Sequence, residues 1–240
     1  MKTLLTTAAL CVFATPLLAA TVNVTKFSKD AYLASTSSIA DGVYQGFENY
    51  SEGNVSDGFS TNVGTFSSLG GVGSGGTVTK ADFPNNDGTK LALRDGNVYG
   101  RVSTTKDLTG NAADDMYLDS NDTKGIVWNV MLAGQSMFNR LVFTVTDAAE
   151  FGNTMEITTA YGTTTISSSG GSKKRLVEID FGKAVSSAKI TLGHFKGNNP
   201  RTNDGFSVDD ITVSAVPLPA SALFLLGGLG GLAAMRRRKG

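Results

Sequence analysis

The chain has 240 residues, of which 21 are basic and 21 acidic, so its formal net charge is zero. Residues 1–20 and 216–240 contain five of the basic residues and no acidic one, which leaves 16 basic against 21 acidic residues between them, a net charge of −5. A domain of that charge is not expected to bind nucleic acid by neutralising phosphates. One histidine and one cysteine in the whole chain also exclude a metal site rich in either residue.

The first 20 residues have the three parts of a secretory signal peptide. A basic start at Lys2 is followed by an apolar run over residues 4–18 and then by two alanines. We expect cleavage after Ala20 or Ala19. Cys11 lies inside the apolar run and not at the cleavage point, so a lipoprotein leader is not expected, and the exported chain would contain no cysteine.

A short helix is predicted at the start of the remaining chain. Ser28 can cap it, residues 29–34 continue it, and Phe27 and Tyr32 are placed to form a hydrophobic staple across its first turn. An extended segment, residues 43–48, follows.

The middle of the chain has the pattern of an all-β domain. Asp outnumbers Glu 16 to 5, and five Asp-Gly pairs mark turns. Apolar and polar residues alternate with period two between the turns. The clearest such runs are residues 141–146, 155–159, 176–181, 188–192 and 206–213. We therefore predict one domain, residues 21–215, with the fold of a jelly-roll-like β-sandwich.

Two acidic segments are candidates for calcium binding. In the last predicted strand, alternation places Asp210 on one face with Phe206 and Val208, and Asp209 on the other. A buried carboxylate needs a partner; one hypothesis is a structural Ca²⁺ shared by Glu48, Asp209 and Asp210, and the other is hydrogen bonding to a turn, or pairing with an arginine, at the rim of the sandwich.

The second segment, residues 114–122, resembles the start of an EF-hand only in Asp119, Asn121 and Thr123. Its sixth and twelfth positions are Lys124 and Val130 instead of Gly and Glu. A solvated turn is the preferred interpretation.

Aromatic side chains could also form a sugar-binding platform. Trp128 shares a strand face with Ile126 and Val130, which favours the core. The tyrosines near predicted turns are better candidates for exposed platforms, and these are Tyr50, Tyr99, Tyr117 and Tyr161.

Catalytic patterns are weak. His194 ends a predicted strand without a Gly-x-Ser-x-Gly elbow, and no pattern of paired glutamates typical of jelly-roll glycosidases is present. We expect no catalytic site, although aspartates could in principle replace the glutamates.

The C-terminal segment, residues 216–240, has three parts. Its motif is Val216, Pro217, Leu218, Pro219 and Ala220. An apolar stretch follows, and the 18 residues 218–235 can just span a bilayer as a helix. The basic cluster Arg236, Arg237, Arg238 and Lys239 would remain in the cytoplasm.

This order closely resembles the VPLPA-CTERM variant of the PEP-CTERM sorting signals of Gram-negative bacteria. The resemblance implies recognition by an exosortase-type membrane protease, an inner-membrane precursor, release to the cell surface or matrix, and an association with exopolysaccharide. An ordinary single-pass anchor is the alternative. We therefore expect an exported, non-catalytic surface or matrix protein; the alternatives are a calcium-assisted carbohydrate-binding domain and a polysaccharide-acting enzyme.

Overall fold

A computed structural model describes residues 20–70, 90–121, 123–149, 154–167, 173–196, 199–200 and 205–216. Residues 1–19 of the predicted leader, the glycine-rich residues 71–76 and the tail after Val216 lie outside these residues. No helix among those described is long and apolar enough to cross a membrane.

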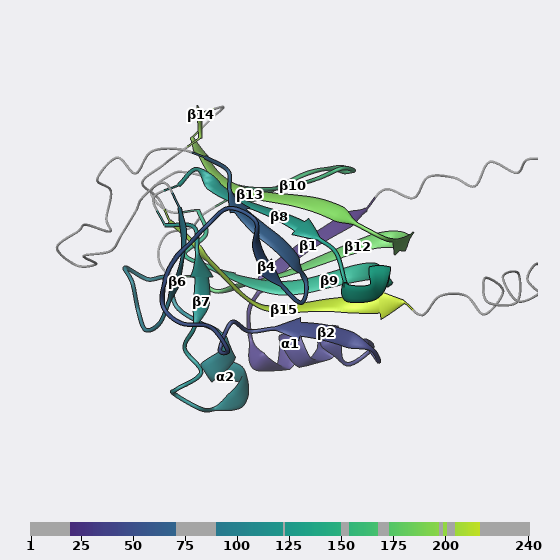
Figure 1. Ribbon diagram of the computed structural model, residues 1–240, viewed down its shortest axis with the longest axis horizontal. Helices are drawn as coiled ribbons and strands as arrows, with labels where there is room; N and C mark the ends of the chain where they lie inside the picture. Colours follow the sequence, from purple (N-terminus) through teal and green to yellow (C-terminus); the bar gives the residue numbers. More distant parts are fainter. Residues whose placement is uncertain are drawn as a thin grey trace, which may run out of the picture.

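Two antiparallel sheets form the domain (Figure 1). In the described residues the first sheet has eight strands, in the order β1 (Thr21–Lys26), β12 (Arg175–Val185), β9 (Met137–Thr146), β15 (Ser207–Val216), β7 (Tyr117–Asp119), β6 (Leu91–Arg94) and β3 (Gly53–Val55), with β2 (Gly42–Gln45) also paired to β15. The second has seven, in the order β11 (Gly162–Ser167), β10 (Thr154–Thr159), β13 (Ala188–Lys196), β8 (Gly125–Val130), β5 (Gly64–Ser68) and β4 (Phe59–Thr61), with β14 (Asn199–Pro200) paired to β13.

This is the jelly-roll-like β-sandwich that the alternation pattern predicts. Each of the five strongest predicted runs lies within or overlaps one strand, namely β9, β10, β12, β13 and β15. Two further short helices, α2 (Thr105–Thr109) and the 3₁₀ helix η1 (Ala133–Gln135), were not predicted.

Aromatic side chains join the two sheets in the core. Trp128 of β8 is fully buried, stacks on Phe66 of β5 and meets Phe143 of β9 edge-on, with centroid distances of 5.5 and 5.8 Å. Its indole N–H donates to the backbone oxygen of Val63 at 3.0 Å. The indole therefore contributes both apolar area and a satisfied polar atom, and the prediction that Trp128 is a core residue is confirmed.

The predicted helix is α1 (Lys29–Thr36), and it covers the outer face of the first sheet (Figure 1). Ser28 caps it by accepting a hydrogen bond from the backbone N–H of Ala31 at 3.2 Å. Phe27 and Tyr32 lie in one buried cluster with Val142 of β9. The cap is confirmed, and the two residues of the predicted staple are buried in the same cluster.

The start of the first strand, β1, and the end of the last strand, β15, lie at the same end of the sandwich. Thr21 pairs with Asp180, Asp180 with Arg140, and Arg140 with Ser214, so Thr21 and Ser214 lie on one row across four strands. Accordingly, the start of β1 and the end of β15 lie at the same end of the sandwich, opposite α2, β6 and β7 (Figure 1).

Candidate functional site

A β-bulge in β15 places its two aspartates on the same face of the sheet. Asp209 is opposite Thr144 of β9, but the next paired residue, Thr212, is opposite Val142. Two residues of β15, Asp210 and Ile211, therefore oppose one residue of β9, and Asp210 has a φ of 48°. Simple alternation placed Asp210 in the core with Phe206 and Val208; that assignment is wrong. Because of the bulge, Ile211 lies in the core and Asp210 lies outside it beside Asp209.

Asp209 caps the segment that begins α2. Its Oδ2 accepts hydrogen bonds from the Ser103 hydroxyl at 2.7 Å and from the backbone N–H groups of Thr104 and Thr105 at 2.9 and 3.3 Å. The side chain is completely buried, and its Oδ1 has no hydrogen-bond partner among the described residues. This carboxyl thus ties residues 103–105 to β15.

Asp210 is held by three hydroxyl groups. Its Oδ1 accepts from Tyr44 of β2 at 2.7 Å and from Thr105 at 2.9 Å, and its Oδ2 accepts from Thr104 at 2.5 Å. The same segment therefore meets both aspartates. Asp210 is hydrogen-bonded, as one of the two hypotheses expects, but its donors lie in β2 and at the start of α2 and not in a turn. The residue is fully buried and does not lie at a rim.

Burial gives this carboxyl pair unusual acid–base properties. Burial raises the pKa of Asp209 well above its ordinary value, and the neighbouring charge of Asp210 raises it further. Burial also raises the pKa of Asp210, although its hydroxyl donors act in the opposite direction. Because no ion pair in the described residues involves either aspartate, the pair favours retention of a proton.

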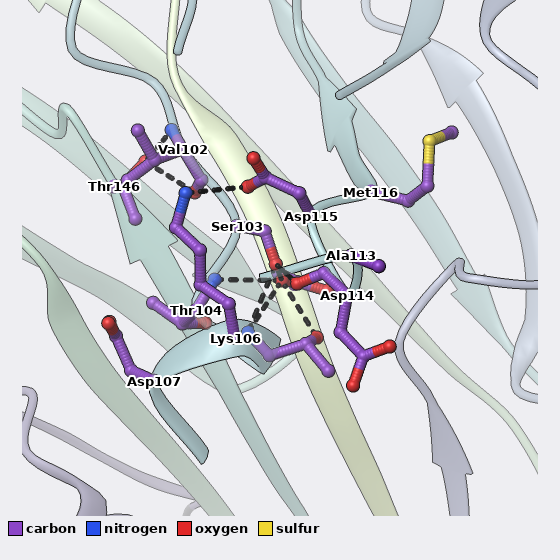
Figure 2. Close-up of polar contacts among 12 residues, drawn as sticks. Val102, Ser103, Thr104, Lys106, Asp107, Ala113, Asp114, Asp115, Met116 and Thr146 are labelled. Atoms are coloured by element: carbon purple, nitrogen blue, oxygen red, sulfur yellow. Dashed lines mark hydrogen bonds and ion pairs between the residues drawn. The ribbon is translucent and has the colours of Figure 1, made fainter. Parts of the chain in front are cut away.

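The loop before β7 packs against residues 102–107 (Figure 2). The Lys106 ammonium group reaches Asp115 Oδ1 at 2.8 Å, and the Ser103 hydroxyl also lies 3.4 Å from the backbone oxygen of Asp114. On the other side of the segment, the Thr146 hydroxyl of β9 accepts a hydrogen bond from the backbone N–H of Val102 and donates one to its backbone oxygen. These contacts fix the segment that holds the aspartate pair.

Glu48 lies next to this network and is partly exposed. Its carboxylate accepts a hydrogen bond from the backbone N–H of Met116 at 3.1 Å. Burial raises its pKa to about 7, and the negative charges of Asp114, Asp115 and Asp210 add to the effect.

The described residues contain no group of three or more His, Cys, Asp or Glu side chains arranged to hold a metal ion. Asp209, Asp210 and Glu48 all accept hydrogen bonds from protein donors instead. A calcium ion at these three residues therefore stays a prediction.

A second buried cluster surrounds Asp119 of β7. Its Oδ1 lies 3.2 Å from Arg101 Nε, and its Oδ2 lies 3.7 Å from Arg94 Nε. Asp119, Asn121 and Thr123 are all buried, and Asn121 has a φ of 54°. The preferred interpretation of a solvated turn is therefore wrong for residues 117–121, which are buried and whose Asp119 is paired with two arginines, whereas residues 114–116 are partly exposed.

The four candidate tyrosines do not form one platform. Tyr117 is completely buried, which is incompatible with a surface role and corrects the expectation that it is exposed. Tyr50 is partly buried against Phe59, and Tyr161 is partly buried against Phe181. Tyr99 is about half exposed (48%). No ring contact among the described residues joins two of the four.

His194 of β13 has a structural environment. It is buried, its Nε2 accepts a hydrogen bond from the backbone N–H of Ala149 at 3.0 Å, and its ring packs on Phe206. These contacts agree with the interpretation of His194 as a satisfied residue near the end of a strand.

Comparisons with known proteins are sparse. No protein-family model and no curated protein matches the chain. Among solved structures, it is similar to a family 11 carbohydrate-binding module of the cellulosomal cellulase Lic26A-Cel5E of Clostridium thermocellum, at 11% identity and a TM-score of 0.28. The match covers 69% of this chain and 95% of the module. A similarity this slight carries no argument about function, and the fold described above rests on the strand registers.

Proposed function

We propose that this chain is an exported, non-catalytic cell-surface or extracellular-matrix protein, sorted through residues 216–240 and associated with exopolysaccharide. One observation supports it most strongly. The first described strand begins at Thr21, directly after the predicted leader, and the last described strand runs to Val216, the first residue of the predicted sorting motif.

The geometry of these two ends suits a tethered precursor. Because Thr21 and Ser214 share one row at the same end of the sandwich, a C-terminal membrane tether would hold that end toward the bilayer and the opposite end away from it. Val216 is paired with Met137, so strand pairing continues to the first motif residue. Removal of the leader and of the residues after Val216 would leave the described strand pairs intact.

The buried carboxylates support a structural role for this domain. Asp209 and Asp210 bind the start of α2, and Asp119 is paired with arginines. Each of these groups has a packing role that needs no reaction to explain it.

Replacing Pro217 and Pro219 together by alanine is expected to abolish C-terminal processing. The two prolines hold the motif extended, which is the conformation that a protease requires of its substrate. With alanine in their place, the apolar helix could continue through the motif, and the extended conformation would be lost. Immunoblots of membrane and medium fractions should show the variant retained in the inner membrane at its unprocessed length. A matched variant, Ser221→Ala, changes a residue just beyond the motif and should be processed normally. Equal processing of both variants would point to a plain anchor or to an unrelated protease.

Calcium-assisted carbohydrate binding is the second candidate function. Glu48 favours it. Burial is the main cause of the raised pKa of this partly exposed carboxylate, and the charges of Asp114, Asp115 and Asp210 add a repulsion that a bound cation would relieve.

If calcium binds there, the exported protein should melt at a higher temperature in calcium than in EGTA, and Glu48→Gln should remove the difference. Glu156→Gln, on the outer side of β10, is the matched control and should keep it. Calcium should also increase co-sedimentation with the producing cell's exopolysaccharide. A melting temperature equal in calcium and EGTA would exclude the calcium site.

A further inference from the structure

The sandwich protects most of its free strand edges. An edge strand presents unpaired N–H and C=O groups, and proteins limit the resulting association with short strands, charges, prolines or covering groups. The edge strands β3 and β4 have only three residues each. The edge strand β2 has four, and the Asn62 side chain donates a hydrogen bond to the backbone oxygen of Tyr44 within it. The edge strand β1 carries Lys26.

Strand β11 has none of these protections. Its six residues, Gly162–Ser167, read GTTTIS and include no charge and no proline. It pairs along its whole length with β10, and in the described part of the chain no strand pairs with its other edge. Thr163, Thr165 and Ser167 are exposed, whereas Ile166 is buried toward the core. One edge of β11 is therefore hydrogen-bonded to β10, and no described strand pairs with its other edge.

We propose that β11 pairs with β11 of a second copy of this chain, in antiparallel orientation about a twofold axis. Such a pair is self-complementary, since each copy offers the same row of donors and acceptors and a twofold axis brings each donor to an acceptor. The strand is uncharged, so two copies do not repel one another there. Threonine is β-branched and favours both extended backbone and cross-strand pairing. The sheet of β11 and β10 then continues across the two molecules.

This inference does not depend on the proposed function, because it concerns an edge of the second sheet, whereas β1 and β15 pair in the first. The start of β1 and the end of β15 belong to the other sheet, so the dimer forms without using either end of the domain.

Cysteine cross-linking tests the pairing directly. Cys11 is the only cysteine in the sequence, so Cys11→Ser gives a chain without cysteine whether or not the leader is removed. In that background Thr163→Cys and Thr165→Cys place a thiol on the exposed side of β11. Thr158→Cys is the matched control: it lies on the adjacent strand β10, paired with Thr163 on one side and Thr191 on the other.

Under mild oxidation of the purified exported protein, at least one β11 variant should form a covalent dimer as its main species, while the Thr158→Cys variant should remain single. Light scattering of the unmodified chain should give twice the mass of one copy. Thr165→Lys should return it to one copy, because lysine protects edges, whereas Thr158→Lys should not. The proposal is overturned if the unmodified chain has the mass of one copy at every concentration. It is equally overturned if a dimer forms but neither β11 variant cross-links more than the control.

Discussion

The free energy of unfolding of this domain is expected to fall as the pH is raised from 5 to 8. The cause is the buried pair Asp209 and Asp210, whose pKa values burial raises, together with Glu48, whose pKa of about 7 has the same main cause. A carboxyl whose pKa is higher in the folded chain stabilises the fold fully below its unfolded pKa, which is about 4. That stabilisation is lost as the pH rises through the folded pKa. Protonation of these three carboxyls thus favours the fold, and their ionisation opposes it.

Each proton that the folded chain keeps and the unfolded chain has lost lowers the free energy of unfolding by about 1.4 kcal/mol per pH unit. Urea unfolding at pH 5, 6, 7 and 8 measures this slope. Asp209→Asn imitates the protonated acid and should flatten the slope, whereas Asp180→Asn, at an exposed position in β12, should leave it unchanged. Stability that rises from pH 5 to 8, or an equal slope in Asp209→Asn, would contradict the assignment.

Replacing Asp119 by alanine is expected to cost about 3–5 kcal/mol of stability, because it removes the fully buried carboxylate that two buried arginines share. Here one buried carboxylate faces two buried guanidinium groups, Arg101 at 3.2 Å and Arg94 at 3.7 Å. It also accepts a hydrogen bond from the backbone N–H of Asn121 at 2.7 Å, which shapes the turn after β7. The substitution should therefore remove both the ion pairs with the arginines and the hydrogen bond that shapes the turn.

Urea unfolding of Asp119→Ala at pH 7 provides the measurement. The matched control is Asp107→Ala, since Asp107 is paired with Lys174 and both side chains are partly exposed. The control should cost less than about 1 kcal/mol, as surface ion pairs do. If the two variants lose similar stability, then the buried cluster contributes no more than a surface pair.

The regular parts of the fold could be predicted from local patterns. The alternation in β9 and β12, the Ser28 cap and the core position of Trp128 all follow from residues close together in the sequence. These features are local because each depends on a repeat of two residues or on one turn of helix.

The contacts of the candidate site could be predicted only in part. The sequence indicates that Asp210 needs a partner, but a bulge adds one residue without any change in composition, so alternation alone assigned Asp210 to the wrong face. Its partners, Tyr44 and Thr104, are 166 and 106 residues away. The partners of Asp119 could not be predicted from local patterns either, because its two arginines come from β6 and from the segment before α2.

The most direct test of the central claim is the intact mass of the exported protein. If the chain is an exported and sorted surface protein, the main species should begin at Thr21 or Ala20 and lack the apolar stretch and the basic cluster Arg236–Lys239. An exported species that retains those residues, or a chain found only in the inner membrane at full C-terminal length, would contradict the account.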